Sequence, residues 1–123
     1  MPFGILQFKL TKVYQLAFEQ AMEIFSITKG FPKEERYSLT DQIRRSSRSV
    51  CANLAEAYRK KIYKANFVLK ITDCDSENSE TSVWLDFSKA CNYISLEQHN
   101  LFIFRNQEIG RLLSHMRTNP EKY

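Results

Sequence analysis

The sequence has 123 residues and a mass of 14.5 kDa, a size that suits one domain spanning residues 1–123. Its 43% hydrophobic and 26% charged residues exclude a disordered or fibrous chain, and its net charge of +4 is a modest basic bias. It contains no run of ~18 apolar residues, and Met1–Leu10 lacks the charged-then-apolar order of a signal peptide. We therefore expect a cytoplasmic protein with no membrane partner.

Glycine and proline are absent between Pro32 and Gly110. A sheet-rich domain would need such residues in its turns, so this gap indicates long helices. Four helices joined by short loops run antiparallel to their sequence neighbours. The sequence therefore predicts an all-α fold, an antiparallel up-down four-helix bundle.

The first helix is expected over residues 11–29, with Thr11 as its N-cap. Apolar and small residues recur there at three- and four-residue steps: Val13, Leu16, Ala17, Ala21, Ile24 and Thr28, widened by Tyr14, Phe18, Met22 and Phe25. Gly30 in a left-handed conformation, followed by Pro32, is expected to end the helix.

The second helix is expected over residues 40–60, with Thr40 as its N-cap. Its predicted core face comprises Leu39, Ile43, Val50, Leu54, Ala57 and Tyr58. The opposite side gathers Arg44, Arg45, Arg48 and Arg59. The helix has a core face and an arginine face, and it ends without a clear stop signal between Arg59 and Lys64.

A third helix over 63–91 and a fourth over 96–117 complete the prediction. The third carries a core stripe with a polar middle: Phe67, Ile71, Cys74, Asn78, Thr81, Leu85 and Ser88. A turn at Asn92–Ile94 follows, and Ser95 with Gln98 forms a capping box that opens the fourth helix. The apolar face of that helix comprises Leu101, Phe102, Ile109, Leu112, Leu113 and Met116.

Residue types that could hold a metal do not occur at ligand spacing. Cys51, Cys74 and Cys91 are far apart and are expected to be buried free thiols. The acids Asp73, Asp75, Glu77 and Glu80 fail as a calcium loop, because Asn78 and Trp84 occupy the positions of its glycine and its last glutamate. Leu96 and Leu112 stand three residues before His99 and His115, where a di-iron bundle needs glutamates.

No arrangement for nucleophilic catalysis is evident either. The candidate nucleophiles Ser46, Ser47, Ser49 and Cys51 lie along a helix rather than on a strained elbow, and no phosphate-binding glycine motif is present. We therefore predict a protein without catalytic residues, metal or cofactor.

The remaining candidate site is basic. It comprises Arg44, Arg45, Arg48, Arg59, Lys60, Lys61 and Lys64, with Tyr58 and Tyr63 interleaved. Such residues can neutralise phosphates and stack on bases, which predicts binding of RNA or DNA. The alternative is that the arginines pair with Asp73, Asp75, Glu77 or Glu80, within a chain or between subunits. Residues 33–64 hold nine Lys and Arg against four acids, and residues 65–92 hold two against five, so both interpretations stay open.

The segment Phe31–Arg59 reads FPKEERYSLTDQIRRSSRSVCANLAEAYR. Its FPKEERY, LTxQIRR and NLAEA elements, with weaker matches at Glu80-Thr81 and Asn92–Ser95, resemble the bacterial four-helix bundle proteins encoded in intervening sequences of large-subunit ribosomal RNA genes. The chain departs from the usual pattern of the family at four positions. Cys51 stands where the family has proline, and Ala57 stands where it has glycine. Arg59 and Lys61 stand where it has a second glycine followed by serine. These changes weaken the expected break between helices two and three and add positive charge.

That family is similar to the accessory variability determinant of diversity-generating retroelements. The resemblance implies a homo-oligomer, a pentamer, with Arg44, Arg45 and Arg48 on a basic surface and a reverse transcriptase as partner. Two functional hypotheses follow. One is a non-enzymatic oligomer that binds structured nucleic acid through the basic face, as an accessory to another protein. The other is an interaction scaffold whose basic and acidic faces serve assembly.

Overall fold

The computed structural model describes residues 7–123, so of the segment Met1–Leu10 only Gln7 onward is described. It contains four α-helices, α2 (Lys12–Thr28), α3 (Leu39–Arg59), α4 (Lys64–Ala90) and α5 (Leu96–Thr118), and the 3-10 turns η1 (Gln7–Leu10), η2 (Lys33–Glu35) and η3 (Pro120–Lys122). Residues 7–123 include no strand, and the predicted all-α four-helix class is confirmed. Each observed helix boundary lies within one residue of the predicted one.

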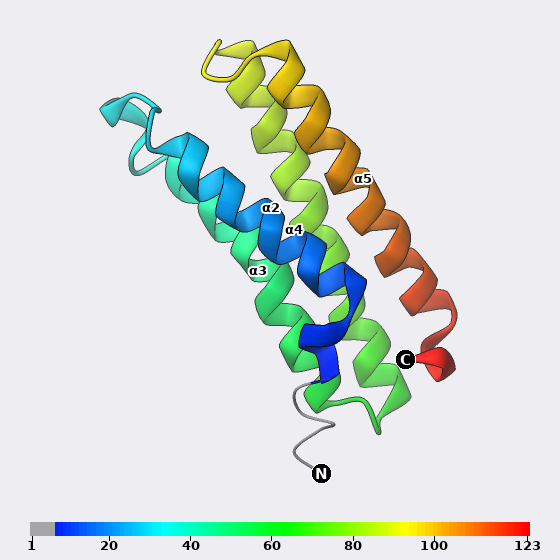
Figure 1. Cartoon of the computed structure of the whole chain (residues 1–123). Helices are drawn as coiled ribbons and strands as arrows, with labels where there is room; N and C mark the ends of the chain where they lie inside the picture. Colours follow the sequence, from blue (N-terminus) through cyan, green and yellow to red (C-terminus); the bar gives the residue numbers. More distant parts are fainter. Residues whose placement is uncertain (1–6) are drawn as a thin grey trace.

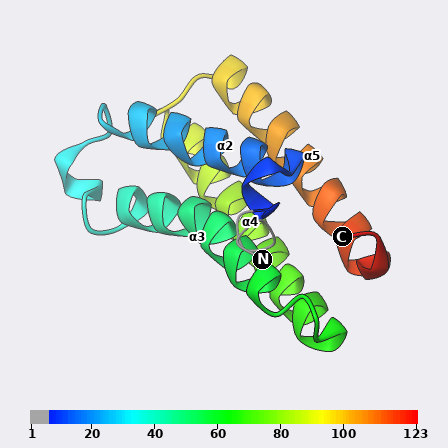
Figure 2. The ribbon, with the colours of Figure 1, turned by 60° about the horizontal axis from the view of Figure 1, so that its bottom comes forward.

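The helices pack around a common axis (Figure 1). The chain turns back at each connection, and each helix contacts its sequence neighbours, while α2 also contacts α5. Figure 2 shows α3 and α4 side by side over much of their length. The α3–α4 connection lies at the same end as η1 and η3, and the other two connections lie at the opposite end (Figure 1).

Two predicted helix starts are confirmed. The Thr11 hydroxyl accepts a hydrogen bond of 3.2 Å from the Tyr14 amide and caps α2. At α5 the capping box is complete, because the Gln98 amide donates to Ser95 Oγ at 3.0 Å and the Ser95 amide donates to Gln98 Oε1 at 2.8 Å. These bonds satisfy amide groups that a helix leaves free at its first turn.

Two other end predictions are wrong. Thr40 lies inside α3 and Ser38 is the N-cap; Glu35 takes the capping role, because its Oε1 accepts from the Leu39 amide at 3.4 Å. Gly30 is not left-handed, since α2 ends through Lys29 in a right-handed conformation.

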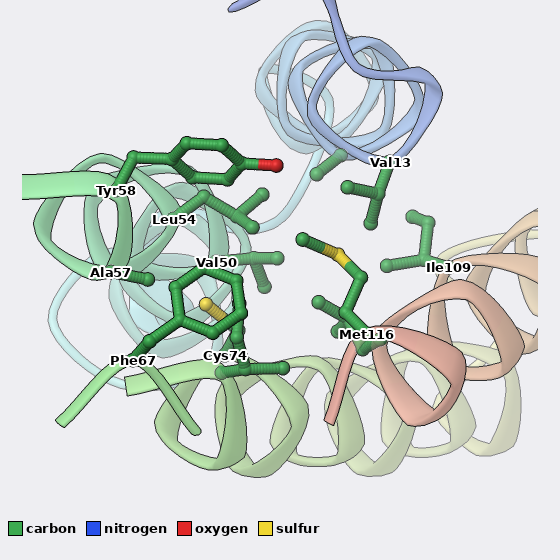
Figure 3. Packing of buried hydrophobic residues seen from close by; sticks show 12 residues of the cluster. Val13, Val50, Leu54, Ala57, Tyr58, Phe67, Cys74, Ile109 and Met116 are labelled. Atoms are coloured by element: carbon green, nitrogen blue, oxygen red, sulfur yellow. The ribbon is translucent and has the colours of Figure 1, made fainter. Parts of the chain in front are cut away.

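The predicted core faces of α3 and α4 are confirmed at every position. Side chains from all four helices meet in the half of the core nearest the α3–α4 connection. Figure 3 shows Val13, Leu54, Phe67 and Met116 from this cluster. On α5 the prediction was wrong for Leu101, which is 66% exposed because it lies at the outer edge of the α2–α5 contact.

The cysteine prediction holds in part. The three thiols are free, and Cys74 is buried, but Cys51 is only half-buried. Cys91 is exposed, because it ends α4 at the tip of the bundle.

A polar layer crosses the bundle and separates two hydrophobic clusters. Its members are all buried: Gln20, Ser46, Ser47, Asn78, Thr81 and Asn106. Asn78 Nδ2 donates to the Asn106 carbonyl at 2.9 Å and Asn106 Nδ2 donates to the Asn78 carbonyl at 3.0 Å, which links α4 to α5. Ser46 and Thr81 share a 2.8 Å hydrogen bond between α3 and α4. The polar middle of the α4 stripe is therefore part of a hydrogen-bonded layer. These hydrogen bonds offset the free-energy cost of burying polar side chains.

Over residues 7–123, no helix is both long enough and apolar enough to cross a lipid bilayer.

Candidate nucleic-acid interface

The seven predicted basic residues form two separate groups along the bundle. Arg44, Arg45 and Arg48, here called the arginine cluster, lie in the first half of α3. Arg59, Lys60, Lys61 and Lys64, here called the basic turn, lie where α3 ends and α4 begins. At ~1.5 Å of rise per residue, Arg48 and Arg59 are about 16 Å apart along the helix axis. They do not make one continuous face.

Arg44 is half-buried and holds α3 to the end of α2. Its Nε donates to Thr28 Oγ1 at 2.8 Å, and its Nη2 donates to the Phe25 carbonyl at 3.4 Å. The guanidinium also lies over the Phe25 ring, 4.7 Å from its centroid. Two of its five N–H donors are thus used inside the chain, and these bonds hold α3 against α2.

Arg45 is paired with acids of α4. Its Nη1 lies 3.0 Å from Glu77 Oε2, and its Nη2 contacts Glu80. The sequence left open whether the arginines pair with acids of the next helix, within a chain or between subunits. Arg45 forms such pairs within the chain. Its side chain is 46% exposed, so the pairs contribute little stability, but they offset its charge.

Arg48 is exposed, and its guanidinium lies 5.5 Å from the centroid of the Phe25 ring. Lys29 Nζ lies 4.9 Å from the same centroid. Phe25 thus gathers Lys29, Arg44 and Arg48 around one aromatic ring. Sequence reasoning placed Phe25 on an apolar face and missed this role, because the contact joins residues of two helices.

The basic turn is the least neutralised group. Within the described part of the chain, none of Arg59, Lys60, Lys61 and Lys64 forms an ion pair with a carboxylate. Lys61 Nζ donates to Gln7 Oε1 at 3.2 Å, a neutral partner that leaves its charge in place. The turn therefore presents four cations at one end of the bundle.

The two tyrosines of the predicted site differ in access. Tyr63 is 60% exposed beside the basic turn, next to Ile62, which is 85% exposed. Tyr58 is 7% exposed and packs in the core against Phe67, and burial raises its pKa to about 12. Tyr63 can therefore stack on a base, whereas Tyr58 cannot, and that part of the prediction was wrong.

The segments Phe31–Tyr37 (FPKEERY) and Asn92–Ser95 (NYIS) meet at the end of the bundle opposite to the basic turn. Tyr93 Oη donates to Glu35 Oε2 at 2.9 Å, and Ser38 Oγ donates to Glu35 Oε1 at 2.6 Å. Phe31, which is buried, packs on the Tyr93 ring with centroids 5.2 Å apart. The hydrogen bonds from Ser38 and Tyr93 lower the pKa of Glu35, and the bond to Glu35 raises the pKa of Tyr93 to about 12. These segments tie the α2–α3 connection to the α4–α5 turn.

The described residues hold no group of three or more His, Cys, Asp or Glu side chains able to bind a metal. His99 Nε2 lies 2.8 Å from Asp86 Oδ1, and His115 Nδ1 lies 2.5 Å from the Tyr123 hydroxyl. Burial raises the pKa of Cys51 to about 11, so this thiol stays protonated at neutral pH and is a poor nucleophile.

Comparisons with known proteins cover most of the chain. A family model described as 23S rRNA-intervening sequence protein matches residues 9–115. A crystal structure of a protein of unknown function from the S23 ribosomal protein family of Bacteroides thetaiotaomicron VPI-5482 is 29% identical, with a TM-score of 0.78 over 86% of this chain and 95% of that one. No functionally curated protein matches. Neither of the two matching descriptions indicates an enzyme.

Proposed function

The chain belongs to the 23S rRNA-intervening sequence protein family, and on that premise we propose that it binds structured nucleic acid, RNA or DNA, as a non-enzymatic homo-oligomer. The basic turn carries the proposal. None of its four cations forms an ion pair with a carboxylate among residues 7–123, and they stand beside the exposed ring of Tyr63. Lysine and arginine side chains in this state can replace the counterions of a phosphate backbone, and an exposed aromatic ring can stack on a base.

The arginine cluster has a secondary place in this proposal. Arg48 is exposed and adds a cation to the surface, whereas Arg44 forms hydrogen bonds with α2 and Arg45 forms ion pairs with α4. We therefore propose the basic turn and Arg48 as the residues that contact phosphates, and Arg44 and Arg45 as residues that hold α3 in place.

The proposal extends to partners. The resemblance to the accessory variability determinant favours a pentamer that works with an enzyme acting on nucleic acid, such as a reverse transcriptase. Large apolar side chains are exposed on α2 at Phe18 and Met22 and on α5 at Leu101 and Phe104, which supports contact with further protein chains.

The second candidate function is a scaffold assembled by charge, with basic α3 of one subunit against acidic α4 of the next. The intrachain pairs of Arg45 with Glu77 and Glu80 work against it, because the same groups would have to be freed before they could pair across an interface.

Fluorescence anisotropy tests the proposed function. The purified protein is titrated into a labelled RNA hairpin and into a matched DNA duplex at several salt concentrations. Neutralisation of three or four phosphates predicts a slope of about −3 in log affinity against log salt, at about −0.9 per phosphate for duplex DNA. Absence of binding at low salt, with the oligomer intact, would overturn the proposal in favour of the scaffold.

A further inference from the structure

A polar hollow of about 290 Å³ lies between the end of α2 and the start of α3, at the far end of the bundle from the basic turn. Four cationic side chains line it: Lys29, Lys33, Arg36 and Arg44. Of these, only Arg44 belongs to the site predicted from the sequence.

The charges around the hollow are strongly unbalanced. Asp41 is the acid in its lining, and within the described part of the chain none of the four cations forms an ion pair with it or with another carboxylate. Nearby, Glu35 is occupied by donors from Ser38, Leu39 and Tyr93. Four cations against one acid leave a local charge of about +3, which favours a multiply charged anion.

Unused hydrogen-bond donors adjoin the same hollow. The amides of Thr40 and Asp41 find no acceptor among residues 7–123, and the first regular bond of α3 runs from the Gln42 amide to the Ser38 carbonyl at 2.9 Å. Free amides at the start of a 21-residue helix are an anion-binding arrangement, to which the helix dipole adds.

Thr40 provides an independent observation. It lines the hollow and is only 8% exposed, yet its hydroxyl makes no hydrogen bond within residues 7–123 and remains accessible to solvent. A hydroxyl that makes no hydrogen bond within the chain and opens to a hollow is free to bond with water or with a ligand. A ligand oxygen in the hollow would supply such a partner.

We propose that this hollow binds a phosphate monoester. Arg36 and Arg44 supply guanidinium donors, Lys29 and Lys33 add charge, and Thr40 with the first amides of α3 completes the cradle. The local charge suits the dianion of a monoester better than the single charge of a backbone phosphodiester. Such a group is carried by a free nucleotide or by the 5′ end of an RNA strand. The inference does not depend on the proposed function, because the basic turn lies at the opposite end.

Nuclear magnetic resonance tests this site on the full chain. Inorganic phosphate, and separately adenosine monophosphate, are titrated into ¹⁵N-labelled protein at constant ionic strength, with chloride as the balancing anion. Saturable shifts centred on the Thr40 and Asp41 amides are expected. Shifts that are linear in phosphate, or spread over all exposed lysines, would overturn the proposal.

Variants locate the binding. The exposed pair Lys33→Gln and Arg36→Gln should weaken phosphate binding at least about tenfold, because each charge-assisted hydrogen bond is worth ~1.5–3 kcal/mol. Thr40→Val, which replaces the hydroxyl with a methyl group of similar size, should also weaken phosphate binding. The control Lys60→Gln, in the basic turn, should leave it unchanged. Equal affinity in the control and in the Lys33 and Arg36 variant would overturn the site.

Two short RNAs of one sequence distinguish the sources. Tighter binding of a 5′-phosphorylated hexamer than of adenosine monophosphate would assign the site to strand ends, and similar affinities would assign it to free nucleotides; both support a monoester site. A 5′-hydroxyl hexamer that binds the hollow as tightly as its phosphorylated counterpart would overturn it. Loss of hairpin binding in basic-turn variants, with phosphate binding retained, would keep the two proposals separate.

Discussion

The Glu35 carboxylate accepts three hydrogen bonds, from the Ser38 hydroxyl, the Leu39 amide and the Tyr93 hydroxyl. It caps α3 and joins the two connections at that end of the bundle. The sequence placed Phe31–Tyr37 in a family signature but could not say what the signature holds together, because Glu35 and Tyr93 are 58 residues apart.

The lowered pKa of Glu35 predicts a pH dependence. A carboxyl whose folded pKa lies below its ordinary value of 4.5 adds stability above that value and loses it as the pH falls through the folded pKa. Glu35→Gln should therefore lower the thermal midpoint at pH 7 and flatten its fall below about pH 4.5. Thermal melts followed by circular dichroism from pH 7 to pH 3 measure this. The neighbouring Glu34→Gln serves as the control, and an identical pH profile in both variants would contradict the assignment.

Asn106 takes part in four hydrogen bonds of the polar layer, as many as Asn78. Its Nδ2 is within hydrogen-bond distance of Gln20 Oε1 and of two oxygens of Asn78. Asn106→Ala should lower the free energy of unfolding by about 2 kcal/mol, because buried acceptors lose their donor. Chemical denaturation measures the loss, with the exposed Asn100→Ala as the control. Equal stability of the two variants would show that the layer contributes nothing.

At the level of the helices, periodicity predicted the core stripes of α3 and α4, because burial on a helix repeats every 3.6 residues. It placed Leu101 of α5 wrongly and missed the buried Gln20 and Asn106. The polar stripe of α4 was predicted in full, although its partners were not. What each cation contacts could not be predicted. Arg45 and Glu77 are 32 residues apart, and the Arg44 donors end on α2, so these contacts depend on how helices pack.

The start of α5 gives a test at this scale. Ser95→Ala removes the hydroxyl half of the capping box and should cost about 1 kcal/mol of stability. Urea denaturation of this variant and of Ser114→Ala, an exposed serine within the same helix, gives the comparison. A Ser95 variant as stable as the Ser114 variant would mean that the cap is dispensable.

Across the whole molecule, charge is arranged differently from what the sequence indicated. The sequence prediction took the seven basic residues as one candidate site, but the folded chain separates them into the arginine cluster and the basic turn. It also places three further cations, Lys29, Lys33 and Arg36, at the opposite end. The balance of +5 charges over residues 33–64 indicated a basic surface. It could not indicate how the charges are distributed, because intrachain ion pairs such as Arg45–Glu77 form only in the folded chain.

Assembly can be tested at the same scale. Because Arg45 pairs inside the chain, we expect the proposed oligomer to depend on apolar contacts rather than on charge. Light scattering should then give one mass, a multiple of 14.5 kDa, from low to high salt. A mass that falls to the monomer as salt rises would favour assembly through basic and acidic faces.

The central claim is that the basic turn contacts nucleic acid, and the salt dependence of hairpin binding in two matched triple variants tests it most directly. One variant changes Lys60, Lys61 and Lys64 to glutamine; the other changes Lys12, Lys70 and Lys89, so both lose the same charge. The basic-turn variant should bind more weakly, with the slope of log affinity against log salt reduced by about two to three, while the control keeps the slope of the unmodified protein. Equal slopes in the two variants would contradict the claim.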